Sequence, residues 1–306
     1  MKSNRIKSNK VKELVINWHL TEACNYKCNY CFAKWGKSNE LHRSFEAIEK
    51  LINNLSDFFI KKDSPLKVKL KYDDVRINFA GGEPMMLGRT LSFVLKLAKQ
   101  KGFKTSIITN GHYLLNKIVE LPHNTLDMVG ISFDSQNYET RQLIGRVDRK
   151  GSSVSADDLK FALTKLSQTQ KNIKTKINTV VNIHNWQEDF SGLISELKIF
   201  KWKVLQVMPY GSNDLLISNE QFNSFVERHS NRKLPIYSES NLAMTESYLM
   251  IDPKGRFYQN TPDSSGYQYS ECINDVGAEI ALNQINFNEA VFIARYFPVE
   301  SILCEV

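Results

Sequence analysis

Three cysteines stand close together near the start of the chain, and their spacing is its clearest chemical signal. Cys24, Cys28 and Cys31 form the pattern C-x3-C-x2-C. Thiolates at this spacing can hold three irons of a cubane cluster, because cysteine sulfur is the usual ligand of iron–sulfur clusters. No fourth protein ligand follows nearby, so one iron would be open to a ligand that is not protein. The pattern therefore predicts a [4Fe–4S] centre with one reactive corner.

Zinc binding and disulfide formation are the alternatives. A structural zinc site needs four closed ligands, and neither His19 nor His42 has finger-like spacing to the cysteines. The chain has only five cysteines in 306 residues, an odd and low number that is typical of a reducing compartment. We interpret the remaining two, Cys272 and Cys304, as ordinary residues. An iron–sulfur cluster is favoured, with zinc as the second choice.

The composition indicates a globular protein with one large core. With 42% hydrophobic residues, the 306-residue chain is long enough for one α/β barrel but too short for two large domains. It contains no run of about 18 apolar residues and no signal peptide, so we expect a cytoplasmic protein with no membrane partner. The net charge is +7, but its lysines and arginines are spread along the chain, so nucleic acid is not an expected partner.

Short apolar runs alternate with segments of helical periodicity. The runs that indicate strands are 14–20, 75–80, 104–109, 127–134, 175–181 and 203–208. Segments with apolar residues at helical spacing are 45–59, 91–98, 159–166 and 190–197. Ser44 is expected to cap the first helix. This alternation predicts a parallel sheet with right-handed crossovers, so the expected fold class is α/β, a partial (βα)6 TIM-like barrel.

Three regions are expected along the chain. Residues 1–12 form a flexible N-terminal segment, residues 13–210 form the barrel, and residues 211–306 form a C-terminal α+β cap. Within the cap we expect a helix near 220–229 and a hairpin at 248–258. We expect the cap to lie on the barrel mouth and to complete the site.

Alternation along the strands predicts a charged barrel interior. Side chains at i and i+2 of a strand face the same side, and the apolar face must meet the covering helices. The opposite face then carries Arg76, Lys176 and Lys203. Buried cations cost free energy unless an anion joins them. These three are candidates for a polyanion pocket, unless they reach solvent at strand ends or pair with carboxylates.

A glycine-rich segment follows the second expected strand. In Ala80-Gly81-Gly82-Glu83-Pro84, the two glycines allow a ligand to approach the backbone closely, and Glu83 offers an acceptor for an amino group. Alone this segment is a weak signal. Because it follows the three cysteines by one strand–helix unit, it becomes a strong indication of a ligand site.

The cysteine run and this segment together resemble the radical S-adenosylmethionine superfamily. The resemblance implies that S-adenosylmethionine chelates the open iron, and that one electron from a flavodoxin- or ferredoxin-like donor yields a 5′-deoxyadenosyl radical. It also implies that Asn110, Ser132 and Asp134 contact the adenosine and that Arg146 meets the methionine carboxylate. The residues expected to bind the cofactor are Phe32, Gly81, Gly82, Glu83, Asn110, Ser132, Asp134 and Arg146.

Longer motifs resemble the viperin family, including its prokaryotic members, across nearly the whole chain. They are Cys-Asn-Tyr-Lys-Cys (24–28), Ile-Asn-Phe-Ala-Gly-Gly-Glu-Pro (77–84), Leu-Ile-Gly-Arg (143–146), Lys-Ile-Asn-Thr-Val-Val-Asn (176–182), Trp-Lys-Val-Leu-Gln (202–206), Glu-Ser-Asn (239–241), Ser-Tyr-Leu (247–249) and Asp-Val-Gly (275–277). The resemblance implies a lyase that converts CTP, UTP or GTP to its 3′-deoxy-3′,4′-didehydro analogue, an antiviral chain terminator. The ribose loses its 4′ hydrogen to the radical and its 3′ hydroxyl as water.

The resemblance also implies which residues bind the ribonucleoside triphosphate. They are Asn17, Arg76, Lys176, Asn178, Lys201, Lys203 and Tyr248. Arg76 and Lys201 differ from the vertebrate pattern but keep its charge. A triphosphate carries about four negative charges, for which lysine and arginine are natural partners. Tyr248 or a lysine is the candidate acid for the leaving hydroxyl, and no residue indicates the preferred base.

Two other functions compete with this one. A radical enzyme that modifies a peptide or a tRNA would fit the same cysteines, but peptide-modifying members often carry extra C-terminal cysteines, and Cys272 and Cys304 are too few. A non-catalytic iron–sulfur or zinc module that binds nucleic acid is the other alternative. The Gly-Gly-Glu-Pro segment and the inward phase of the lysines weigh against it.

Overall fold

All six predicted strands form, and they make the parallel part of one sheet. They are β1 (Glu13–His19), β2 (Asp74–Ala80), β3 (Lys104–Thr109), β4 (Met128–Ser132), β5 (Lys174–Val181) and β6 (Lys201–Gln206). Each pairs in parallel with the next. The computed structural model describes residues 11–31, 39–61, 64–117, 121–170, 172–209, 213–230, 235–261 and 266–295.

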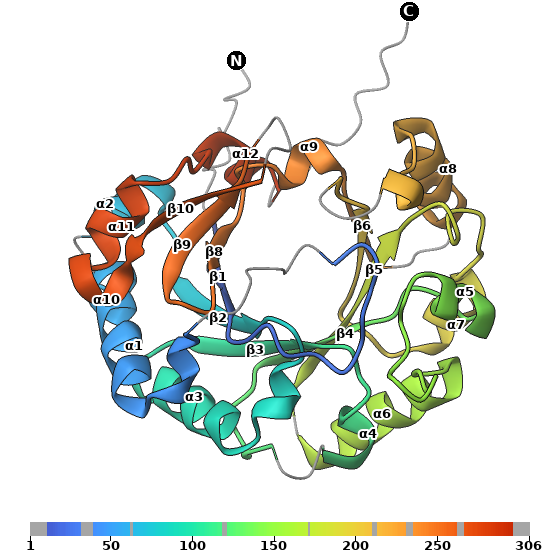
Figure 1. Cartoon of the computed structure of the whole chain (residues 1–306), viewed down its shortest axis with the longest axis horizontal. Coiled ribbons are helices and arrows are strands. Elements are labelled where there is room, and N and C mark those ends of the chain that lie inside the picture. Colours follow the sequence, from blue (N-terminus) through green and yellow to red (C-terminus); the bar gives the residue numbers. More distant parts are fainter. Residues whose placement is uncertain are drawn as a thin grey trace, which may run out of the picture.

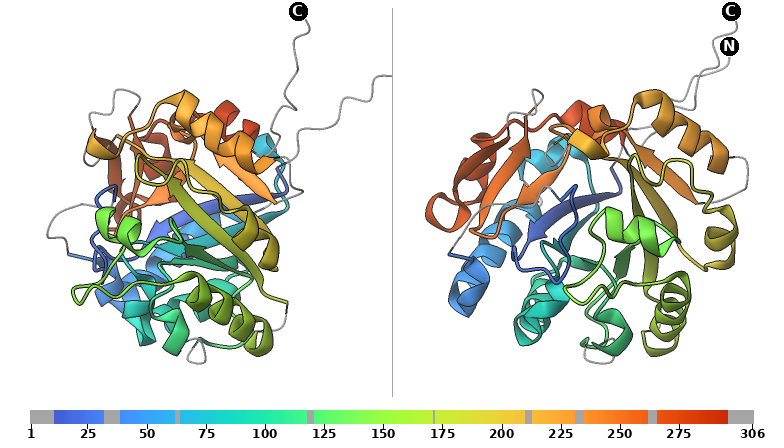
Figure 2. Two further views of the ribbon diagram at one scale, coloured as in Figure 1. Left: turned by 90° about the vertical axis from the view of Figure 1, so that its right-hand side faces the viewer. Right: turned by 45° about the vertical axis from the view of Figure 1, so that its right-hand side comes forward.

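The described part of residues 211–306 extends both edges of this sheet. β7 (Ile236–Glu239) pairs with β6, and β8 (Leu249–Ile251) pairs with β1, both in parallel. β9 (Arg256–Asn260) and β10 (Tyr267–Cys272) follow β8 in antiparallel order, so the sheet has ten strands. In Figure 2 the orange strands of this region continue the sheet from the dark blue β1, with β8 as the direct neighbour of β1 and β9 beyond it.

The helix and hairpin expected within the C-terminal region do form, and its strands join the barrel sheet. The expectation that this region completes the site stays a prediction. The C-terminal elements form barrel wall, because the free edges of β1 and β6 offer backbone groups that new strands can pair with. The expected helix is α8 (Asn219–Ser230).

Helices cover the outside of the barrel, as Figure 1 shows. The longer ones besides α8 are α1 (Phe45–Phe59), α3 (Arg89–Gln100) and α6 (Ala156–Thr169). Ser44 caps α1, since its hydroxyl accepts a 3.1 Å hydrogen bond from the amide of Ala47. None of the helices in the described ranges is long and apolar enough to cross a membrane.

Shorter elements connect the strands. The short helices are α2 (Pro65–Leu70), α4 (Leu114–Lys117), α5 (Tyr138–Leu143), α7 (Ser191–Glu196), α9 (Asn241–Met244), α10 (Ile273–Val276), α11 (Ala278–Asn283) and α12 (Glu289–Ala294). Single 3-10 turns are η1 (Leu41–Arg43), η2 (Pro84–Leu87) and η4 (Asn213–Leu215).

The inner face of the barrel is polar, as the alternation along the strands predicts. Asn78 donates a 2.8 Å hydrogen bond to Asn17 on β1 and accepts one of 2.7 Å from Ser106 on β3. Arg76 donates to the same serine at 2.6 Å. Residues of the opposite phase, such as Ile16 and Ile77, are fully buried in the core beneath the helices.

Candidate active site

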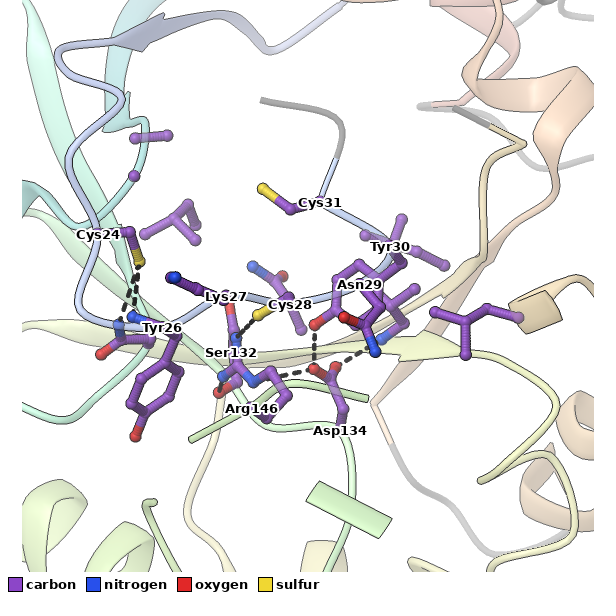
Figure 3. A pocket seen from close by; sticks show the side chains of 18 of the residues that line it. Cys24, Tyr26, Lys27, Cys28, Asn29, Tyr30, Cys31, Ser132, Asp134 and Arg146 are labelled. Carbon is purple, nitrogen blue, oxygen red and sulfur yellow. Dashed lines mark hydrogen bonds and ion pairs between the residues drawn. The ribbon is translucent and has the colours of Figure 1, made fainter. Parts of the chain in front are cut away.

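A cavity of about 1130 Å³ opens at the carboxyl ends of the parallel strands. Cys24, Cys28 and Cys31, from the segment after β1, line it together, as Figure 3 shows. Because parallel strands all end at the same rim of a barrel, residues far apart in sequence converge there. Six of the eight residues expected to bind the cofactor also line this cavity. They are Gly81, Gly82, Asn110, Ser132, Asp134 and Arg146.

Nitrogen donors surround the thiols. The amide of Tyr26 lies 3.4 Å from Cys24 Sγ, and the Asn110 side-chain amide lies 3.8 Å from the same sulfur. Arg146 Nη1 lies 3.8 Å from Cys28 Sγ. Burial raises the pKa of Cys28 to about 11, and Arg146 opposes this shift. Soft thiols with N–H donors directed at their sulfurs fit an iron–sulfur cluster.

The three thiols do not converge on one point. Among the described residues, no three His, Cys, Asp or Glu side chains gather closely enough to hold a single metal ion. A cubane cluster takes one thiolate at each of three irons, so its ligands need not meet at one atom.

The two glycines hold the cysteine segment against the sheet. The amide of Gly82 donates to the carbonyl of Thr21 at 2.6 Å, and the amide of Glu83 donates to that of Ala23 at 2.8 Å. A Cβ on Gly81 would lie 2.5 Å from the Thr21 oxygen, and one on Gly82 would lie 2.1 Å from the Ala23 oxygen. Only glycine permits this backbone approach.

Gly145 has a similar role that the sequence reasoning missed. Its φ is +74°, and a Cβ there would lie 2.2 Å from the carbonyl oxygen of Lys27 between two of the cysteines. In the sequence, only its position beside Arg146 in the Leu-Ile-Gly-Arg motif could have indicated this close backbone approach.

The carboxylate of Glu83 has three hydrogen-bond donors within the chain. It is fully buried, accepting from the Met85 amide at 3.0 Å, the Thr109 hydroxyl at 2.8 Å and the Asn110 amide at 2.7 Å. Burial raises its pKa, and these hydrogen bonds oppose the shift. Glu83 does not line the cavity. It joins η2 to the end of β3. The expectation that Glu83 also accepts a hydrogen bond from a ligand amino group stays a prediction.

Arg146 links the cysteine segment to β4. Its Nε lies 3.1 Å from Asp134 Oδ2, its Nη2 donates to the carbonyl of Ser132, and its guanidinium lies 5.4 Å from the centre of the Tyr26 ring. Tyr30 donates to the same Asp134 carboxylate. Burial acts to lower the pKa of Arg146, but these neighbours raise it well above its ordinary value. Arg146 is therefore a fixed, buried cation beside the cysteines.

Two predicted features lie outside the described residues. They are Phe32 and most of the N-terminal segment, residues 1–10, and the same holds for Cys304, the cysteine interpreted as an ordinary residue.

Among the residues expected to bind substrate, Asn178 alone lines the cavity. Its Oδ1 is buried and finds no hydrogen-bond partner within the described part of the chain. Lys176 precedes it by two residues on β5 and so lies one level deeper in the barrel, where it pairs in register with Lys201 on β6. The next register pair on the same face of the sheet is Asn178 and Lys203.

These deeper cations affect one another. Burial lowers the pKa of Lys176 well below its ordinary value, and repulsion from Lys203, Arg76 and Lys201 lowers it further. Burial lowers the pKa of Lys203 to about 8, against the attraction of Glu239. A bound anion would stabilise the charged form of these buried lysines.

Two of the cations already have carboxylate partners, which was the alternative considered for them. Arg76 Nε lies 2.8 Å from Glu13 Oε2. Lys203 Nζ lies 2.9 Å from Glu239 Oε1 and donates to the Tyr248 hydroxyl at 2.6 Å. Lys201 lies 3.8 Å above the Tyr237 ring.

Comparison with known proteins agrees with this site. The Radical SAM superfamily profile matches residues 18–189. The S-adenosylmethionine-dependent nucleotide dehydratase of Pseudoalteromonas ulvae is 46% identical over 289 residues, which cover 94% of each chain. The protein of the same name from Psychrobacter lutiphocae is 41% identical over 93% of this chain and 95% of its own.

The chain belongs to the S-adenosylmethionine-dependent nucleotide dehydratase family of the radical SAM superfamily. A vertebrate member, from Oncorhynchus mykiss, is 33% identical over 92% of this chain and 78% of its own. Among solved structures, one titled "Native anSMEcpe with bound AdoMet" has a TM-score of 0.62 at 14% identity and covers 90% of this chain and 82% of its own. That likeness shows the shared fold.

Membership in this dehydratase family confirms several predictions. The protein is a radical SAM enzyme of the viperin type, with the α/β partial barrel that such enzymes share. Its cofactors are a [4Fe–4S] cluster and S-adenosylmethionine. Cys24, Cys28 and Cys31 are the residues that would hold the cluster.

Proposed function

We propose that this enzyme dehydrates a ribonucleoside triphosphate, CTP, UTP or GTP, to the 3′-deoxy-3′,4′-didehydro analogue. The observation that carries the proposal is the order of groups along the barrel. Six of the predicted cofactor residues line the cavity, Asn178 lies on its inner wall with an unpartnered oxygen and in register with Lys203, and Lys176 and Lys201 lie one level below. A nucleotide that enters the barrel with its phosphates first would bring these phosphates to the lysines.

The charge of the site supports a polyphosphate. The pKa values of Lys176 and Lys203 are lowered by burial, so these ammonium groups are destabilised in the empty barrel. About four negative charges on a triphosphate would offset that cost through charge-assisted hydrogen bonds.

The chemistry divides between cofactor and protein. When bound, the cluster and S-adenosylmethionine supply a radical that can take the 4′ hydrogen of the ribose. Asn178, with its free acceptor, would orient a ribose hydroxyl. Tyr248 and Lys203, joined by a 2.6 Å hydrogen bond, form the candidate donor pair for the proton that leaves with the 3′ oxygen. We also propose a flavodoxin- or ferredoxin-like protein as the donor of two electrons, one for the cleavage of S-adenosylmethionine and one for the nucleotide radical that remains after water has left.

One assay tests the proposal. The anaerobically reconstituted enzyme is given S-adenosylmethionine, dithionite and all four ribonucleoside triphosphates together. We expect 5′-deoxyadenosine, together with one nucleotide product lighter than its substrate by one water. If no nucleotide loses water under these conditions, the proposed reaction is wrong.

A further inference from the structure

Glu239 lies at the end of β7, where side chains from β6, from the segment before β8 and from the end of α12 meet. The residue is buried at the end of β7. Its carboxylate contacts groups from three other places. Lys203 on β6 lies 2.9 Å away, the hydroxyl of Tyr248 just before β8 donates to it, and Arg295 at the end of α12 lies 3.4 Å away.

Arg295 belongs to the same cluster. Its guanidinium lies 3.6 Å from the centre of the Tyr248 ring, and its Nη1 donates to the carbonyl of Ser247 at 2.5 Å. The arginine is therefore fixed beside Glu239 and Lys203, although no sequence motif indicated it.

The charges around Glu239 are unbalanced. Burial acts to raise its pKa, but Lys203 and Arg295 lower it to about 2, so it is ionised at any physiological pH. Its charge also opposes the downward pKa shifts of Lys176 and Lys201. The carboxylate of Glu239 thus interacts with four cations, which are Lys176, Lys201, Lys203 and Arg295. Arg76 instead forms an ion pair with Glu13.

We infer that Glu239 is an internal counter-ion that a bound polyphosphate must compete with for Lys203 and Arg295. In the empty enzyme it keeps these side chains and Tyr248 in place. When a polyphosphate binds, its oxygens take over contacts with the same cations, so Arg295 becomes an additional phosphate-binding residue. The inference rests on the proposed function, because it assumes that the substrate's phosphates reach this group.

The inference predicts that removing the charge of Glu239 strengthens anion binding. Glu239→Gln keeps an acceptor oxygen for Tyr248 but removes the competing charge. Calorimetric titration of the reconstituted enzyme with inorganic tripolyphosphate, at constant ionic strength, should show about tenfold tighter binding in this variant. The matched control is Glu49→Gln, an exposed position on α1 with the same change of charge, and it should bind as wild type does.

The outcomes separate this inference from the proposed function. If wild-type enzyme does not bind tripolyphosphate, the triphosphate pocket itself is wrong. If wild type binds but Glu239→Gln binds equally or more weakly at an unchanged melting temperature, Glu239 is only a structural partner and the inference fails.

A second pair of variants covers the case in which Glu239→Gln does not fold. Lys203→Met alone leaves Glu239 beside Arg295, whereas Lys203→Met with Glu239→Gln replaces the ion pair by a neutral pair, which barrels and cores often tolerate. The double variant should bind tripolyphosphate more tightly than the single one. Equal or weaker binding would overturn the inference.

Discussion

The guanidinium of Arg146 lies 3.8 Å from the sulfur of Cys28, so a buried cation donates a hydrogen bond to a proposed ligand of the cluster. The ion pair with Asp134 holds it there. Hydrogen bonds to cluster sulfurs are among the features that set reduction potential.

Replacing this arginine should make the cluster harder to reduce. We expect Arg146→Gln to retain the cluster but to shift its midpoint potential to a more negative value. The substitution removes the positive charge and weakens the N–H···S hydrogen bond. A redox titration followed by electron paramagnetic resonance measures this directly. Arg149→Gln, an exposed neighbour, is the control, and equal potentials in both variants would contradict the assigned contact.

Cys28→Ala should abolish the cluster's brown absorbance and all cleavage of S-adenosylmethionine, because a three-thiolate site cannot lose a ligand. Cys272→Ala should keep both, since Cys272 lies on β10 with its thiol directed at the carbonyl of Lys254, 3.5 Å away. The readouts are the visible spectrum and 5′-deoxyadenosine formation. Cleavage that survives in Cys28→Ala would exclude this cysteine as a ligand.

Gly82→Ala should destabilise the protein by about 2–4 kcal/mol and reduce its cluster content. The new methyl group would lie 2.1 Å from the Ala23 oxygen and push the cysteine segment off the sheet. Gly192→Ala is the matched control, because that glycine is helical, exposed and has nothing within 4 Å of an added Cβ. Thermal melting and iron content are the measurements, and equal melting temperatures would show that the segment is not held here.

Lys176→Ala should weaken binding of the nucleoside triphosphate by about tenfold or more, given the strength of charge-assisted hydrogen bonds. Cleavage of S-adenosylmethionine should persist but become uncoupled from nucleotide dehydration. Lys96→Ala, an exposed lysine on α3, should change neither. Unchanged nucleotide affinity in Lys176→Ala would place the phosphates elsewhere.

The lowered pKa of Lys203 predicts two opposite pH dependences. The folded value is about 8 and the unfolded value 10.5, so between them the unfolded chain binds more protons. This lysine therefore lowers the stability of the empty enzyme below pH 8, and stability recovers as pH rises to about 10.5. Triphosphate binding should instead weaken above pH 8, because it then requires proton uptake.

Calorimetry in buffers of different ionisation enthalpy measures that uptake. Lys203→Met should lose part of it, since Lys176 also has a lowered pKa, and Lys96→Ala should retain all of it. Proton uptake of equal size in Lys203→Met and wild type would assign the titration to another group.

Local patterns were sufficient to predict most of the barrel. The apolar run 104–109 became β3 without change, and Ser44 does cap α1. The polar phase of β1 and β2 was readable because side chains alternate along any strand. The stripe at 190–197 yielded a shorter helix, α7, because Phe190 lies at its N-cap.

Contacts between distant segments could not be predicted in this way. Lys203, Tyr248 and Arg295 meet at Glu239 although they belong to segments far apart in the sequence, and no local spacing records that meeting. The buried carboxylate of Glu83 accepts a hydrogen bond from the hydroxyl of Thr109 at the end of the next strand. Its motif therefore predicted its location but not its partners.

The pairing of β1 with β8 sets an order for the folding of this chain. β1 emerges from the ribosome first, yet Asn17 bonds to Leu249, 232 positions later. One edge of β1 must therefore wait for most of the polypeptide to be made. Closure over so long a loop is slow, and an unpaired edge is prone to aggregation. We expect folding yield to depend on the final third of the chain, and on chaperones that shield β1 until β8 arrives.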